Sequence, residues 1–191
     1  ALEYYLKSLK LAEFLVDSIE ISRNLINMGI VYKKQGNYTK SLDYYFLALK
    51  INKARGIKRH LMNTLGNIGN VYNAQKDYTK ALNYFFQVLK IAEELENKNA
   101  IAGTLINIGS TYSSQAASME QNSKKDSLYN SALEYSLKGL KIANEMGHKH
   151  WEANALAVIG GIYLSINKYH EAENYFSKAL IICKEIGALD E

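Results

Sequence analysis

Apolar residues recur at helical spacing along most of the chain, and the pattern as a whole repeats. Leu25, Met28 and Tyr32 lie three or four residues apart, which is typical of one face of a helix. A glycine precedes the tyrosine by three residues, and it returns at intervals of 40, 40 and 51 residues: Gly29, Gly69, Gly109 and Gly160. A fixed period of this length indicates a repeat protein.

Each repeat predicts two helices joined by a tight turn. We expect helix pairs at 22–35 with 38–55, 61–75 with 78–96, 100–121 with 124–146, and 150–166 with 169–186. The opening residues ALEYYLKSLK align with SLDYYFLALK at residues 41–50, so they predict the second helix of a repeat whose first helix is missing. We therefore expect a single array cut from a longer protein, with a half repeat at 1–19 and full repeats at 22–56, 61–96, 100–147 and 150–187.

The repeated glycine, called the signature glycine below, is costly inside a helix, by roughly 1 kcal/mol relative to alanine. Its recurrence at one site of every repeat indicates a close approach of the neighbouring helix, where a Cβ would clash. Other glycines fall just past the second helices and suit a left-handed C-cap: Gly56, Gly147 and Gly187.

The second helices share small residues that face the first helix, each followed four residues later by a large one in three repeats. The small residues are Ser41, Ala81, Ala132 and Ala172, and the large ones are Tyr45, Phe85 and Phe176. Together with the Leu–Gly–Tyr pattern of the first helices, this arrangement resembles the tetratricopeptide repeat (TPR) family over nearly the whole chain.

The resemblance implies an all-α fold, a right-handed superhelical solenoid of antiparallel helix pairs whose first helices line a concave groove. Two features depart from the usual unit. The period of 40 residues exceeds the common value of about 34, and the chain contains no proline. Longer units of this kind resemble the sensor and interaction arrays of bacterial signalling regulators.

The third repeat contains 11 additional residues between Tyr112 and Ala132. Eleven residues make about three helical turns, and the inserted stretch has no glycine or proline. We expect two prolonged helices joined near Asn122 rather than a floppy loop.

Asparagines recur beside the signature glycine, at sites that face the groove in TPR arrays. Asn27, Asn67 and Asn107 form one row, which Val158 interrupts, and a further row holds Arg23, Asn63, Gly103 and Asn154. Because an amide offers both a donor and an acceptor, such rows can pair with the backbone of an extended peptide. The candidate groove residues are Arg23, Asn27, Lys34, Asn63, Asn67, Asn70, Asn73, Asn107, Ser110 and Asn154. The alternative is that some of these amides cap or bridge adjacent helices.

Other chemistry finds little support in the sequence. The fifteen tyrosines mostly recur at inward positions, and the net charge of +4 includes no block of like charges, so we expect no nucleic-acid partner. His148, His150 and His170 do not match the spacing of a metal site. No catalytic motif, cofactor motif or membrane-spanning run occurs. We therefore expect no enzyme activity, no cofactor, no metal and no membrane insertion.

The last repeat differs from the others in its second helix. Glu173 replaces a leucine, and Ile181 replaces the lysine found at the equivalent sites, Lys50, Lys90 and Lys141. A polar change at an inter-repeat site is typical of a terminal repeat, and the isoleucine indicates a covered patch. We expect the stack to end here and a different element to dock on it. We also expect possible end-to-end self-association, because the opening half repeat leaves apolar residues without cover.

The sequence thus predicts a non-catalytic module that binds a peptide or a partner helix in its groove, and the resemblance places it in a bacterial signalling regulator. The alternative is a structural scaffold or self-assembling array without a groove ligand. A receptor for a small molecule or peptide signal also stays open.

Overall fold

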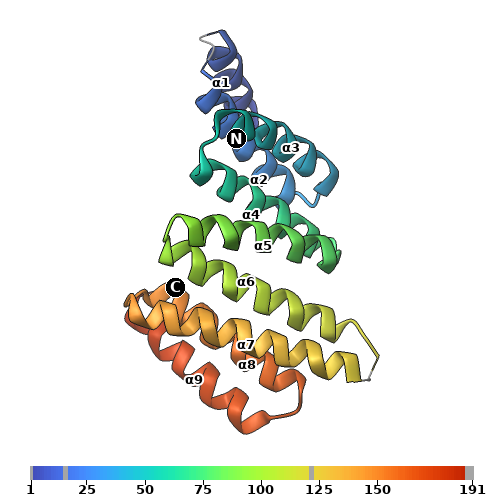
Figure 1. The fold of residues 1–191 in the computed structure, drawn as a ribbon, viewed down its shortest axis with the longest axis vertical. Helices are drawn as coiled ribbons and strands as arrows, with labels where there is room; N and C mark the ends of the chain where they lie inside the picture. Colours follow the sequence, from blue (N-terminus) through green and yellow to red (C-terminus); the bar gives the residue numbers. More distant parts are fainter. Residues whose placement is uncertain (1, 15–16, 121–122, 188–191) are drawn as a thin grey trace. The chain divides into compact units, whose positions relative to one another are not determined.

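The computed structural model describes residues 2–14, 17–120 and 123–187, and these are almost entirely helical (Figure 1). The helices within this part of the chain are α1 (Leu2–Phe14), α2 (Ser18–Lys34), α3 (Tyr38–Arg55), α4 (Lys58–Ala74), α5 (Tyr78–Glu94), α6 (Lys98–Ala117), α7 (Ser123–Glu145), α8 (Lys149–Ser165) and α9 (Tyr169–Glu185). The all-α fold and the succession of first and second helices are as the sequence predicts.

The chain divides into two compact units, Ala1–Ile91 and Ala92–Glu191. In the first unit α1 packs on α2, α2 on α3 and α3 on α4, and the first helices α2 and α4 touch. In the second unit α6 packs on α7, α7 on α8 and α8 on α9, and the first helices α6 and α8 touch. Each unit is therefore built from helix pairs whose first helices are neighbours.

All four first helices begin earlier than the apolar pattern indicates, and the difference is largest in α2 and α4. We expected α2 to begin near Ser22, but it begins at Ser18, and Asp17 is its N-cap. The Asp17 Oδ1 accepts the backbone N–H groups of Ile19 at 3.0 Å and Glu20 at 3.1 Å, which otherwise have no partner at a helix start. Likewise α4 begins at Lys58 rather than at residue 61. The first turn of α4 is polar, so the apolar period does not reveal it, whereas the first turn of α2 contains Ile19 and Ile21 and its start is marked by the Asp17 cap.

The predicted glycine caps are confirmed. Gly56, Gly147 and Gly187 have φ angles of 66°, 63° and 65°, in the left-handed region that favours glycine. The equivalent residue of the second repeat is Glu96, with φ of 49°, so the chain tolerates a side chain at this turn.

The signature glycines give room to an aromatic ring of the second helix in three repeats. A Cβ would lie 2.5 Å from the ring of Tyr45 at Gly29, 2.8 Å from Phe85 at Gly69 and 2.9 Å from Phe176 at Gly160. The expected close approach is therefore confirmed, but its partner in these repeats is a side chain rather than the backbone.

The third repeat has no ring at this position, because Ser136 stands where the others have tyrosine or phenylalanine. A Cβ on Gly109 would clash with the Ser136 hydroxyl oxygen and would also lie 2.8 Å from the Ala132 carbonyl oxygen and 3.0 Å from the Ser136 backbone nitrogen. Here α6 and α7 meet backbone to backbone. The signature glycine therefore allows two kinds of packing, against an aromatic ring in three repeats and directly against the second helix in the third.

The insertion extends both helices of the third repeat, as expected. α6 has 20 residues and α7 has 23, against 17 or 18 in the other pairs. Ala116 and Tyr129 from the extended ends are buried together with Ala132 and Ile162, so the added turns enlarge the core of the second unit. The expected joint at Asn122 lies outside the described residues.

A buried amide connects three helices of the first unit. Asn52 on α3 is 1% exposed; its Oδ1 accepts the Ser22 hydroxyl of α2 at 2.9 Å, and its Nδ2 donates to the Thr64 hydroxyl of α4 at 2.9 Å. Thr64 donates in turn to the His60 carbonyl at 2.9 Å. Every polar group of this network is paired, as buried polar groups must be.

The two kinds of glycine site predict opposite effects of alanine in the second unit. Gly109→Ala places a Cβ against the backbone of α7, so we expect the free energy of unfolding to fall by roughly 1–3 kcal/mol. Gly161→Ala is the matched control, since nothing lies within 4 Å of its Cβ, and the better helix former should stabilise by up to about 1 kcal/mol. Urea unfolding of both variants checks this, and equal shifts of the midpoint would contradict it.

Tyr45 predicts a stabilising substitution. Its hydroxyl is buried without a hydrogen-bond partner, while the neighbouring Ser41 hydroxyl donates to the Gly29 carbonyl at 2.8 Å. Burial raises the pKa of Tyr45 to about 12, against a weaker opposing effect of Ser41. Tyr45→Phe, which copies Phe85, should raise the unfolding free energy at pH 7 by about 1 kcal/mol, because it removes an unpaired buried group.

The same substitution should change the pH dependence of stability. An acid whose pKa is raised on folding stabilises fully below its unfolded pKa of about 10, and this contribution is lost as the pH rises towards 12. Unfolding midpoints between pH 9 and pH 12 should therefore fall less steeply for Tyr45→Phe than for the unchanged chain. If the midpoints of the two proteins fell equally with pH, Tyr45 would not be the source of the pH dependence.

Candidate functional site

The candidate residues fall into two sets, one on the first helices of each unit. In the first unit Arg23, Asn27 and Lys34 lie on α2, and Asn63, Asn67, Asn70 and Asn73 lie on the adjacent α4. In the second unit Asn107 and Ser110 lie on α6, and Asn154 lies on the adjacent α8. A single groove through all ten residues stays a prediction.

None of the candidate residues lies in the core. Arg23, Lys34, Asn63 and Asn154 are exposed, and the other six are half-buried. Within α4 the four asparagines at positions 63, 67, 70 and 73 recur every three or four residues, so they lie along one face of the helix. They form a continuous polar stripe beside the buried apolar face of the same helix.

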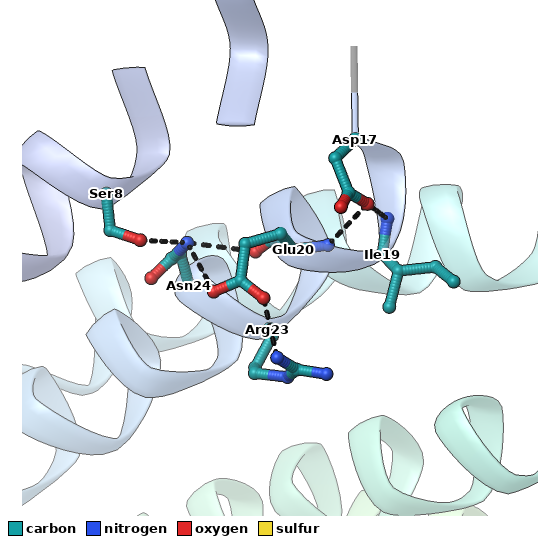
Figure 2. Close-up of polar contacts among 6 residues, drawn as sticks. All are labelled: Ser8, Asp17, Ile19, Glu20, Arg23 and Asn24. Atoms are coloured by element: carbon teal, nitrogen blue, oxygen red, sulfur yellow. Dashed lines mark hydrogen bonds and ion pairs between the residues drawn. The ribbon is translucent and has the colours of Figure 1, made fainter. Parts of the chain in front are cut away.

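Arg23 is held by a neighbour on its own helix, as Figure 2 shows. Its Nη1 donates to the Glu20 Oε2 at 2.6 Å, in a pair at the surface. Beside it Asn24 is buried, and its Nδ2 donates to the Ser8 hydroxyl of α1 at 2.9 Å and to the Glu20 carbonyl at 3.0 Å. A surface ion pair contributes little to stability, so a ligand carboxylate can compete with Glu20 for the guanidinium.

The side chains of the predicted asparagines have no hydrogen-bond partner among the described residues. This holds for Asn27, Asn63, Asn67, Asn70, Asn73, Asn107 and Asn154. The amides that do bridge helices are others, namely Asn24, Asn52 and Asn99. We considered the alternative that the amides of these rows bridge adjacent helices. The amides that do so are residues outside the rows.

Asn73 on α4 and its counterpart on α2, Lys33, are both partly removed from water without a partner that compensates for it. The Asn73 Oδ1 is buried and unpaired, and an unsatisfied buried acceptor is costly. Lys33 occupies the equivalent site on α2; it is half-buried, and desolvation lowers its pKa from the ordinary value. No acidic side chain of the described residues pairs with Lys33. Both groups would gain from a polar ligand.

In the second unit, Trp151 on α8 lies beside the candidate rows, and the sequence analysis missed it. Its ring lies on Gly103 of α6, where a Cβ would be only 2.7 Å away. Its indole N–H donates to the Asn99 side chain, also on α6. Gly103, which the sequence placed in a row with Arg23 and Asn63, is therefore covered. The sequence signal that could have indicated this contact was the single tryptophan of the chain.

The tyrosines stack on one another between the two helices of each repeat. The ring centroids are 5.4 Å apart for Tyr32 with Tyr44, 5.6 Å for Tyr72 with Tyr84, 5.7 Å for Tyr112 with Tyr135, and 5.4 Å for Tyr163 with Tyr175. Lysine ammonium groups lie over several of these rings, such as Lys80 at 5.1 Å from the Tyr72 centroid. The tyrosines of these pairs are therefore packing residues, as the sequence analysis expected, but Tyr169, another repeated tyrosine expected to face inward, is 63% exposed.

One of the candidate histidines has a structural role. The His148 Nδ1 accepts the backbone N–H of Trp151 at 3.3 Å and so caps the start of α8. Within the described ranges no group of three or more histidine, cysteine or acidic side chains could hold a metal ion. Among the same residues, no helix combines the length and the apolar character that crossing a membrane requires.

Solved structures share this fold at low sequence identity. Aspartyl phosphate phosphatase F from Bacillus subtilis superimposes with a TM-score of 0.82 at 21% identity, over 98% of this chain and 46% of that one. A Rap protein complexed with competence and sporulation factor gives 0.79 at 20%, over 96% and 48%. NprR in complex with its cognate peptide NprX gives 0.66 at 19%, over 91% and 48%. The chain spans about half the length of each.

Among curated proteins no sequence matches this chain significantly. Family models for the tetratricopeptide repeat match residues 25–59, 60–118 and 153–186. These matches span most of the chain and contain all of the signature glycines. The chain belongs to the tetratricopeptide repeat family.

Proposed function

We propose that this chain is a non-catalytic interaction module that binds an extended peptide along the polar face of its first helices. The observation that carries the proposal is the set of unpartnered asparagine side chains, above all the buried Oδ1 of Asn73. A buried acceptor left open in the free protein is stabilised when a ligand N–H reaches it. A backbone presents such donors at every residue except proline.

The dimensions of α4 fit a short extended segment. Asn63 and Asn73 are ten residues apart, so the stripe between them is about 15 Å long. An extended peptide rises about 3.3 Å per residue, and four or five residues therefore match this length. Amides can donate to its carbonyls and accept from its N–H groups without regard to its side chains. Side-chain selectivity would come from the flanking groups, such as Arg23 and Lys33.

Two of the similar structures support this class of ligand. The Rap protein is complexed with competence and sporulation factor, and NprR is in complex with its cognate peptide NprX. These facts concern those proteins, and the likeness is one of fold, so the argument for this chain is by analogy. It favours a signalling regulator of bacterial type as the parent protein.

The second candidate function is a structural scaffold that assembles through its ends. The observation that favours it is the exposure of apolar residues on α9, where Ile181 is 58% exposed. A scaffold would leave the asparagine stripe without a ligand. The two functions therefore differ in whether substitutions on α4 alter binding.

A double substitution on α4 tests the peptide site. Peptides selected from a phage library of random decapeptides would be synthesised and titrated calorimetrically against the unchanged chain and against Asn67→Ala with Asn70→Ala. Each lost hydrogen bond is worth about 0.5–1.5 kcal/mol, so the affinity should fall roughly 5- to 150-fold. The melting temperature should hardly change, because each site contributes within about 0.5 kcal/mol.

The matched control is Asn130→Ala with Asn144→Ala, two exposed asparagines of α7, and it should bind like the unchanged chain. Failure to select any peptide, or equal affinity of the α4 variant, would contradict the proposal. A melting temperature lowered as by a core substitution would show instead that the amides hold the helices together.

Replacing Asn73 by leucine should raise stability and lower peptide affinity. Asn73→Leu removes the unpaired buried oxygen, so we expect the free protein to be stabilised by about 1 kcal/mol. The same change removes the acceptor offered to the ligand, and the affinity for a selected peptide should fall about tenfold. Thermal unfolding and calorimetry of this one variant measure both effects. A loss of stability would show that Asn73 is satisfied in solution.

A further inference from the structure

The first helices of the first unit carry an excess of positive charge. α2 and α4 together contain five lysine or arginine side chains and one acid, Glu20. The cations are Arg23, Lys33, Lys34, Lys58 and Arg59. This excess of four equals the net charge of the whole chain. α6 and α8, the first helices of the second unit, contain only two such cations and one acid. The charge therefore concentrates on the helices that carry most of the open asparagines.

Lys33, in the last turn of α2, is a cation that the fold does not require. The helix dipole favours a cation in this turn, but the exposed Lys34 already supplies one. The equivalent sites of the later repeats hold Asn73, Ser113 and Leu164. Lys33 is half-buried, and no acid of the described residues pairs with it. A carboxylate brought by a ligand would compensate for the water that this ammonium group has lost.

Arg23, nearer the start of α2, still has donors for a ligand carboxylate. Within the described residues only its Nη1 is engaged, by the Glu20 carboxylate at 2.6 Å (Figure 2). A guanidinium has five N–H donors in a planar fork that matches a carboxylate. The neighbouring first helix α4 contains no acidic residue that could take up the others.

The separation of Arg23 and Lys33 sets the spacing of the two ligand carboxylates. Steps of three or four residues through Asn27 and Ile30 connect them along α2, and ten residues of helix span about 15 Å. Residues i and i+4 of an extended peptide point to the same side and lie about 13 Å apart. The long, flexible lysine side chain can cover the difference. Acids three residues apart point to opposite sides, so only one of them can face α2.

We propose that the ligand of this face is an acidic peptide, bound in an extended conformation, whose Asp or Glu side chains at positions i and i+4 pair with Arg23 and Lys33. Such binding rests on the proposed function, because the asparagines of α4 hold the peptide backbone while the two cations of α2 select its side chains. The first unit is sufficient for it, since α2 and α4 are in contact.

Pools of synthetic decapeptides test the charge and the spacing. Each is biotinylated at its N-terminus and amidated at its C-terminus, so that carboxylates come from side chains alone. The first pool has glutamate at positions 3 and 7 and random uncharged residues elsewhere. The second has glutamate at positions 3 and 6, and the third has glutamine at positions 3 and 7. In biolayer interferometry with the 191-residue chain, the first pool should bind about tenfold more tightly than either of the others.

Variants of the two cations test the residues. Lys33→Gln and Arg23→Gln should each weaken binding of the first pool about tenfold and bring it close to that of the third. The matched control is Lys50→Gln, which removes an exposed cation of α3 and should leave the affinity unchanged. Lys33→Glu should bind a pool that carries one glutamate and one lysine at positions 3 and 7, in one of the two orders only. That order gives the direction of the bound peptide. Circular dichroism should be the same for all variants.

The two proposals fail separately. If the glutamine pool binds as tightly as the first, and Asn67→Ala with Asn70→Ala weakens both, the chain binds peptides without selecting acids, and only the present proposal is overturned. It is also overturned if both glutamate spacings bind equally or if Lys33→Gln leaves the affinity unchanged. The same result follows if binding requires a free C-terminal carboxylate in pools made without amidation. Absence of binding by every pool overturns it as well, and failure to select any peptide from the phage library then overturns the peptide site itself.

Discussion

The contact between a helical glycine and the second helix is the constraint from which the rest of each repeat follows. Without a Cβ at Gly29 or Gly69, the ring of Tyr45 or Phe85 can lie flat on the first helix and be completely buried. The distance between the paired helices is then set by the thickness of a ring. In the third repeat Gly109 meets the backbone of α7 directly. That repeat lengthens its helices, and the buried Tyr129 of the extension supplies aromatic packing further along the pair.

Much of the fold could be predicted because it depends on local, repeated chemistry. The period, the helix pairs, the left-handed glycine caps and the extended third repeat all follow from residues close together in the sequence. What could not be predicted depends on partners far apart. The identity of the group facing Gly109 changes because Ser136 stands where a ring is expected, and Trp151 reaches Gly103 across 48 positions. The early start of α2 was missed because it depends on the Asp17 side chain, which caps the helix, and not on the apolar period.

The positions of the candidate residues could be predicted from the sequence, but whether each amide has a hydrogen-bond partner could not. Repeat phasing placed the asparagines on the first helices, where the structure has them. Phasing cannot tell an amide that bridges helices from one that is left open, since Asn24, Asn52 and Asn67 have the same side chain. The distinction comes from neighbours: Asn24 has Ser8 beside it and Asn52 has Ser22 and Thr64, while Asn67 has no partner within the described residues. Open amides on a half-buried face make the surface receptive to a backbone.

The Asn52 network also limits which repeat can follow the first one. The positions equivalent to Ser22 hold Met62, Ala102 and Ala153, and those equivalent to Asn52 hold Ala92, Ala143 and Cys183. Ser22 and Asn52 belong to the same repeat, so the bond between them moves with that repeat. The Nδ2 of Asn52 takes its acceptor from the next repeat, where Thr64 supplies it and where Thr104 holds the equivalent position of the third repeat. The fourth repeat has Ala155 there, so recombination that placed it directly after the first repeat would leave the amide without this partner, at the desolvation cost of an unpaired polar group. The first repeat therefore restricts which repeats can follow it.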